Sequence, residues 1–210
     1  MERGEGRRRR NRRKNTKKED EALRKEGKLA VVGMDSKRHV LDLYPEGASE
    51  AGLLLPNPWV LWMHNRDDNW MEDSYKELIV IPSIPTFWRV LNNFYFLGYG
   101  LKHLYWMREG IMPTWEDVNN RNGSFCTFQT DIYGTPELFQ SFCLAMATES
   151  LLVDGKTSQL NGISVDPKPR CVILKLWSKS AEDFRPFFHP DMENRLEGVS
   201  TQFRKIVPER

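Results

Sequence analysis

The sequence has few of the residues from which catalytic and metal-binding sites are usually built. Its 210 residues contain only three cysteines (Cys126, Cys143 and Cys171), without CxxC spacing, and four scattered histidines. We therefore expect no metal site, and cysteines that are reduced core thiols of an intracellular protein. The sequence also has no nucleophile elbow, P-loop or glycine-rich dinucleotide motif. These absences indicate a binding protein rather than an enzyme.

Long apolar runs are missing as well. No stretch approaches the roughly 20 apolar residues that a transmembrane helix requires, and no apolar segment follows the basic N-terminus as it would in a secretory signal. We therefore expect neither a membrane span nor secretion. The expected location is the cytoplasm.

Charge is nearly balanced at +2 overall, but it is unevenly distributed. Residues 1–27 carry twelve Lys or Arg and six Asp or Glu, which leaves the remaining chain mildly acidic. A segment so rich in charge cannot bury enough apolar surface to fold, so we expect a disordered basic tail over 1–27 and one domain over 28–210. The tail's role stays open between a solubilising segment, a nuclear import signal and an RNA-binding arm.

The spacing of apolar residues predicts an α+β fold with an antiparallel sheet, because strands occur in runs without βαβ alternation. The predicted strands cover residues 59–63, 78–81, 125–130, 162–165 and 171–179, and Pro82 is expected to end the second. Helices are predicted from Ser83, as N-cap, through Phe94, over 137–152, and with less support over 192–207.

The first predicted helix carries two apolar faces. Phe87, Val90 and Leu91 recur at helical spacing and form a core-facing stripe. Ile84 and Trp88 lie four residues apart and form a second patch beside it. This patch is either a surface for a partner or part of one wide core face.

Two tryptophans lie in segments that are typical of loops. Trp70 and Trp115 both stand among carboxylates and turn-forming residues, where a core would not place them. Such rings indicate a stacking platform for a flat, cationic ligand. Glu116 directly follows Trp115, and its carboxylate could accept hydrogen bonds from a base edge with adjacent N–H donors, as in guanine.

The last predicted hairpin adds cations beside a third tryptophan. Alternation places Lys175 and Trp177 on the face opposite an apolar core face, after a turn that contains Lys168 and Arg170. The alternative is an ordinary solvated strand face. Together with the two loop tryptophans, these residues predict a pocket for a nucleotide, particularly a positively charged one.

These segments resemble the mRNA cap-binding family of translation initiation factor 4E. Residues 110–117, with 119–123 after them, are similar to the family's "GI-PMWED…NKRGG" segment, residues 59–62 to "WALWF", and Phe87-Trp88 to "VEDFW". The match runs from about residue 53 to 180. The resemblance implies one curved antiparallel sheet of about eight strands, backed by about three α-helices on its convex side.

The resemblance also assigns roles to residues. Trp70 and Trp115 would enclose 7-methylguanine, Glu116 would accept from its N1 and N2 hydrogens, and Trp177 would lie near the methyl group. Lys168, Arg170 and Lys175 would meet the phosphates of the ligand, a 7-methylguanosine cap or 7-methyl-GTP. On the opposite surface Ile84, Trp88, Phe139 and Leu144 would receive a Tyr-x-x-x-x-Leu-apolar helix of initiation factor 4G or a 4E-binding protein. We expect a monomer without cofactors.

The chain departs from the family pattern at two cationic positions. Phe125 and Ile173 stand where the family has basic residues, and Lys175 lies on the same strand face as Ile173. The "His-Pro-Leu" segment of the family has no clear equivalent. Three functions therefore stay open: a translation initiation factor, a cap-binding translational repressor that does not engage factor 4G, and a reader of methylated lysine.

Overall fold

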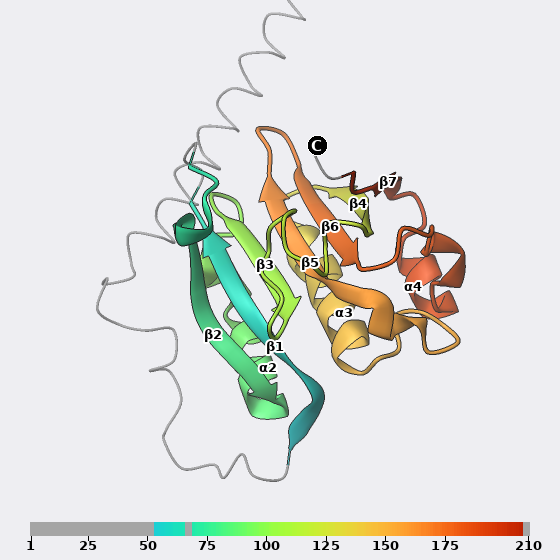
Figure 1. Ribbon diagram of the computed structural model, residues 1–210, viewed down its shortest axis with the longest axis horizontal. Helices are drawn as coiled ribbons and strands as arrows, with labels where there is room; N and C mark the ends of the chain where they lie inside the picture. The colour runs from blue at the N-terminus through green and yellow to red at the C-terminus, as the bar shows by residue number, and fades with distance from the viewer. Residues whose placement is uncertain (1–52, 66–68, 208–210) are drawn as a thin grey trace, which may run out of the picture. The chain divides into compact units, whose positions relative to one another are not determined.

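A computed structural model describes residues 53–65 and 69–207 of the chain. The predicted tail of residues 1–27 lies outside this range. Within it, seven strands form one sheet in the order β2-β1-β3-β5-β6-β4-β7, and every neighbouring pair is antiparallel (Figure 1). The strands are β1 (Leu54–His64), β2 (Tyr75–Ser83), β3 (His103–Arg108), β4 (Ser124–Thr130), β5 (Leu160–Pro167), β6 (Val172–Ser178) and β7 (Ser200–Lys205).

Among the described residues, three α-helices accompany the sheet: α2 (Ile84–Asn92), α3 (Thr135–Ala147) and α4 (Pro190–Arg195). Figure 1 shows α2 and α3 behind one face of the sheet, and α3 contacts β1, β5 and β6. Short 3₁₀ turns cover Glu72–Ser74, Phe94–Leu97, Lys156–Gln159 and Arg185–Phe187. The α+β prediction is confirmed, with seven described strands in place of about eight.

Helix α2 forms as its sequence predicts. The hydroxyl of Ser83 caps it by accepting a 3.4 Å hydrogen bond from the Thr86 amide, and Pro85 occupies the first turn. The predicted stripe of Phe87, Val90 and Leu91 is buried. Strand β2 does not end at Pro82, because β2 lies at the edge of the sheet, where a residue without an N–H is tolerated.

Three segments differ from their prediction. Strand β3 was not predicted, because five of its six residues are buried and it shows no alternation of apolar and polar residues. Residues 192–207 do not form a helix: α4 ends at Arg195, Gly198 adopts a φ of 77°, and β7 follows. A glycine in the left-handed region is a common end signal of a helix. Helix α3 also ends five residues before the predicted Leu152.

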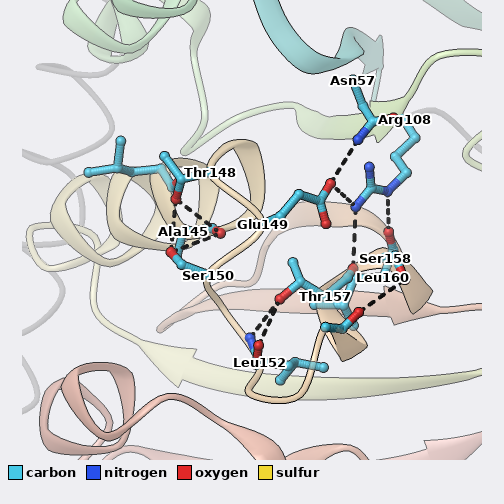
Figure 2. Close-up of polar contacts among 12 residues, drawn as sticks. Asn57, Arg108, Ala145, Thr148, Glu149, Ser150, Leu152, Thr157, Ser158 and Leu160 are labelled. Atoms are coloured by element: carbon cyan, nitrogen blue, oxygen red, sulfur yellow. Dashed lines mark hydrogen bonds and ion pairs between the residues drawn. The ribbon is translucent and has the colours of Figure 1, made fainter.

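A half-buried arginine joins strands and loops on the side where α3 ends. Figure 2 shows Arg108 of β3 donating to the carbonyl oxygens of Leu160 (2.7 Å) and Thr157 (3.3 Å) and pairing with Glu149 Oε1 at 2.7 Å. Its guanidinium also lies 4.7 Å from the centre of the Trp59 ring. This cluster ties β3 to β5 and to the end of α3 by hydrogen bonds to charged groups, which are worth about 1.5–3 kcal/mol each.

The cysteines are unpaired, as predicted. Cys126 and Cys143 are buried, and Cys171 is half-buried. Burial raises the pKa of the Cys126 thiol to about 12 and raises that of Cys143. Both thiols therefore behave as small apolar core groups rather than as nucleophiles.

Candidate functional site

A cavity of about 420 Å³ opens among side chains of β2, β3, β5, β6 and three connecting segments. It brings together five residues that the sequence predicted for a ligand site: Trp70, Trp115, Lys168, Lys175 and Trp177. The other lining residues are Tyr75, His103, Tyr105, Pro113, Ser164, Val165 and Asp166. Two further predicted residues, Glu116 and Arg170, are exposed and do not line the cavity.

The loop that holds Trp115 is fixed by buried amide and carboxylate groups. The side-chain amide of Asn120 is completely buried and donates to the carbonyl oxygens of Met112 (2.9 Å) and Thr114 (2.8 Å). Asp117 accepts from the Met112 amide at 2.9 Å, and Asn161 of β5 donates to Asn120 Oδ1 at 2.9 Å. These bonds hold the loop in one conformation and leave the Trp115 side chain 41% exposed.

Trp70 reaches the cavity from the segment before β2. Its ring stacks on that of His64 with 4.3 Å between centroids and an angle of 10°, and it meets His103 edge-on at 5.2 Å. The side chain is 52% exposed. The segment is anchored at His64, whose Nε2 lies 2.6 Å from the Asn69 carbonyl oxygen. One face of the indole is therefore supported by protein, while much of the ring remains available to a ligand.

Trp177 and Trp115 pack together at the side of the cavity formed by β6. Their ring centroids lie 5.0 Å apart, and Phe125 meets Trp115 edge-on at 5.2 Å. The Trp177 indole donates a 3.0 Å hydrogen bond to the Ser164 hydroxyl. Beneath the rings lies a small apolar cluster of Tyr105, Met107, Phe125, Trp177 and Ile206. Alternation along β6 places Trp177 on the same strand face as Lys175, where it lines the cavity with little exposed surface.

Lys175 extends into the aromatic rings of the cavity. Its Nζ lies 4.7 Å from the centroid of Trp115, 5.0 Å from that of Phe125 and 5.3 Å from that of Trp177. Burial lowers the pKa of Lys175, and the nearby carboxylate of Asp166 partly offsets this effect. The ammonium group is thus held by cation–π contacts at a cost in hydration.

Asp166 is a carboxylate within the cavity that the sequence interpretation did not single out. Its Oδ2 lies 2.5 Å from Lys168 Nζ, and its Oδ1 lies 3.1 Å from His103 Nδ1. Burial on its own would raise the pKa of Asp166, but the interactions with His103 and Lys168 hold it below its ordinary value. Asp166 therefore carries a negative charge at neutral pH.

Tyr75 and Tyr105 also line the cavity; Tyr105 belongs to the apolar cluster, and Tyr75 packs against it. Burial raises the pKa of Tyr75, a hydrogen bond with Tyr105 lowers it in part, and the charge of Glu116 raises it further. Burial also raises the pKa of Tyr105 well above its ordinary value. Both phenols are therefore protonated at neutral pH, and Glu116 lies close enough to act on Tyr75 through its charge.

Three of the four residues predicted for a partner surface are exposed, and one is not. Ile84 and Trp88 of α2 and Leu144 of α3 are 40%, 39% and 42% exposed, and we refer to these three residues as the α2–α3 surface. The prediction for Phe139 is wrong. Its side chain has no exposed surface, because it stacks on Phe94 at 4.5 Å within the core.

Sequence reasoning missed several residues that shape the site. Asn120 lies within residues 119–123, which were matched to the family's motif but were given no role in the site. His103 and Tyr105 belong to the unpredicted strand β3, and Asp166 directly precedes the basic turn. These side chains lie close together because β3 pairs with β5, and no local pattern in the sequence predicts that pairing.

The described residues contain no helix that could cross a membrane. Residues 53–65 and 69–207 also hold no group of three or more histidine, cysteine, aspartate or glutamate side chains that could bind a metal ion. The chemistry of the cavity is thus that of aromatic rings, two lysines and one carboxylate.

Comparison with known proteins gives consistent matches. A family model described as eukaryotic initiation factor 4E matches residues 54–207. Eukaryotic translation initiation factor 4E-1 of Schizosaccharomyces pombe is 29% identical over 160 residues, which are 73% of this chain and 68% of the relative. Eukaryotic translation initiation factor 4E of Candida albicans is 24% identical over 164 residues, with 73% and 72% covered.

Solved structures show the same fold. A complex of Caenorhabditis elegans eIF4E-3 with the 4E-binding protein Mextli and a cap analog matches with a TM-score of 0.56 and 25% identity, covering 70% of this chain and 82% of the other. Schistosome eIF4E complexed with m7GpppA and 4E-BP matches with a TM-score of 0.62 and 19% identity, covering 73% and 88%. The second likeness bears on the fold alone.

Proposed function

The chain belongs to the eukaryotic initiation factor 4E family, and on this premise we propose that it binds the 7-methylguanosine 5′ cap of mRNA and recruits the translation machinery through the α2–α3 surface. The single observation that carries the proposal is the cavity, in which Trp70 and Trp115 from separate loops are joined by Trp177 and two lysines. It acts by binding, and no catalytic residue is assigned.

The base would be recognised by stacking and by one carboxylate. Methylation at N7 gives guanine a positive charge, which strengthens its attraction to indole faces by about 0.5–2 kcal/mol for each cation–π contact. Trp70 and Trp115 supply the two faces, and both are about half exposed. Glu116 accepts from the N1 and N2 hydrogens, and its charge already acts on Tyr75 at the cavity.

The phosphates would meet the cations of the β5–β6 hairpin. Lys168 and Lys175 line the cavity, and Arg170 lies exposed in the same turn. Trp177 lies against Trp115 and would approach the methyl group. The solved C. elegans relative was bound to a cap analog, which supports the same class of ligand here.

The α2–α3 surface would receive an amphipathic helix. Ile84, Trp88 and Leu144 each expose about two fifths of their side chains, and such apolar side chains anchor a helix of the Tyr-x-x-x-x-Leu-apolar type. The C. elegans relative was solved with the 4E-binding protein Mextli. The proposed partners are initiation factor 4G or 4E-binding proteins.

The cap assignment is tested by retention of the full chain on 7-methyl-GTP resin. We expect retention that free 7-methyl-GTP reverses and that GTP does not. Trp115→Ala should abolish retention, because it removes one stacking face. Trp88→Ala is the matched control, since Trp88 lies on α2 and outside the cavity, and it should be retained. Equal elution by GTP would contradict cap specificity.

A cap-binding repressor is the second candidate, and one observation favours it. Two positions that are basic in the family hold the apolar residues Phe125 and Ile173. The site therefore has fewer cations to bind the cap phosphates than the family pattern provides, which predicts weaker cap binding than an activator needs. A pull-down with a Tyr-x-x-x-x-Leu-apolar peptide separates the two roles. An activator should retain the peptide and lose it in Trp88→Ala. Failure of the wild type to retain it would favour the repressor.

A further inference from the structure

The cavity contains a carboxylate at the place where a ligand's phosphates would enter. Asp166 lies on β5, and its side chain is only 18% exposed. It pairs with Lys168, one of two lysines that line the cavity, and with His103. A cavity built only to hold a polyanion would gain nothing from a negative charge in this position.

The second lysine is also coupled to this carboxylate. The charge of Asp166 favours the protonated form of Lys175, and the Lys175 ammonium is enclosed by three aromatic rings. The two lysines and the one carboxylate that line the cavity sum to a formal charge of only +1. Ile173, the residue opposite Asp166 in the β5–β6 register, adds no charge.

A phosphate that approaches Lys168 must therefore share this lysine with Asp166 or displace the carboxylate from it. In both cases the phosphate lies near a negative charge in a partly buried site, where screening is weak. Each further phosphate adds another negative charge to this repulsion. The first phosphate is attracted by the net positive charge of the cavity, whereas the second and third phosphates meet a cavity whose charge the first has already neutralised.

We propose that Asp166 is a specificity-determining residue that competes with the ligand's phosphates for Lys168 and Lys175, so that the cavity gains little affinity from the second and third phosphates. This inference rests on the proposed cap binding. It assigns to the cavity a ligand class in which the cationic base, rather than the length of the phosphate chain, supplies most of the affinity.

The test is calorimetric titration of the full chain with 7-methyl-GMP and with 7-methyl-GTP at one fixed ionic strength. In the wild type the triphosphate should bind no more than about tenfold more tightly than the monophosphate. Asp166→Asn should widen this ratio by about a further tenfold, the order expected when one unit of repulsion is removed from a partly buried site.

Two variants serve as controls. Asp166→Glu keeps the charge and should keep the wild-type ratio. Asp183→Asn makes the same chemical change at a carboxylate that pairs with Arg185 outside the cavity, and it should also keep the ratio. The melting temperature of each variant shows that it is folded.

An unchanged or smaller ratio in Asp166→Asn would overturn the inference and leave cap binding intact. A wild-type ratio above about a hundredfold would overturn it without any variant, so the test does not depend on Asp166→Asn folding. If the wild type binds neither nucleotide, cap binding fails and this inference fails with it.

Discussion

Replacing Lys175 with methionine should have opposite effects on stability and on binding. The lysine carries its charge among three rings at 4.7–5.3 Å, and burial lowers its pKa, so the charged form costs folding free energy. Methionine keeps an unbranched chain and makes sulfur–aromatic contacts worth about 0.3–1.5 kcal/mol. The substitution removes a cation–π attraction worth about 2 kcal/mol. Once the hydration cost of the buried charge is removed, we expect the free energy of unfolding at pH 7 to be unchanged or raised by about 1 kcal/mol.

Binding should weaken in the same variant. A charge-assisted hydrogen bond to a phosphate contributes about 1.5–3 kcal/mol, so the dissociation constant for 7-methyl-GTP should rise by about 10- to 100-fold. The loss should be smaller for 7-methylguanosine without phosphates, because that ligand leaves the cation unused. A variant that binds 7-methyl-GTP more weakly but is no less stable indicates that Lys175 serves ligand binding rather than folding.

The pH dependence of stability gives a second readout of Lys175. Because its pKa in the folded protein lies below the ordinary value of 10.5, there is a pH range below 10.5 in which the unfolded chain keeps a proton that the folded protein has lost. Within that range the stability of the wild type should rise with pH relative to that of Lys175→Met. Urea unfolding at pH 7 and at successively higher pH measures this difference.

The matched control is Lys179→Met, an exposed lysine just after β6. It should change neither stability nor affinity by more than a few tenths of a kcal/mol. The reasoning would be refuted if Lys175→Met lost several kcal/mol of stability while its affinity for 7-methyl-GTP stayed at the wild-type value.

Three further predictions concern the scaffold. In Gly123→Ala the new Cβ would lie 1.9 Å from the backbone oxygen of Ser178, so urea unfolding should show a free energy of unfolding lower by about 3 kcal/mol or more. Gly110 has a φ of 79° and open space around it, so Gly110→Ala should lower the free energy of unfolding by only about 1 kcal/mol. Asn120→Ala leaves two loop carbonyls without their donor, so it should cost about 1–3 kcal/mol and weaken 7-methyl-GTP binding in calorimetry. The pKa of Asp166 in the folded protein is depressed below the ordinary value of 3.8, so the stability that its charge contributes is present above pH 3.8 and is lost as the pH falls through the folded pKa. In that acid range, unfolding measurements should show the wild type losing the extra free energy of unfolding that it has over Asp166→Asn.

Local patterns in the sequence were sufficient to predict the helices and strands that have one buried face. Helix α2 was predicted from the Ser83 cap and its apolar stripe, and β6 from the alternation that buries Val172, Leu174 and Leu176. In both, the period of the apolar residues equals the period of the structure. Strand β3 is buried on both faces and has no such period, so it was missed.

The tryptophans and lysines that line the cavity were singled out from the sequence, whereas its carboxylate and the residues that hold its loops were not. Trp70 and Trp115 stand out because a large ring in an acidic turn is unusual. Asp166 and His103 lie 63 positions apart in the sequence and meet only through the pairing of β3 with β5. Phe139 was assigned to the partner surface by resemblance, which identifies a helix but not the depth at which its side chain lies.

The central claim is that two indoles hold a positively charged methylated guanine. The most direct measurement is the quenching of intrinsic tryptophan fluorescence by 7-methyl-GTP compared with GTP. We predict strong, saturable quenching by 7-methyl-GTP, weak quenching by GTP, and loss of the saturable signal in both Trp70→Ala and Trp115→Ala. Equal quenching by the two nucleotides, or an unchanged signal in either variant, would contradict the claim.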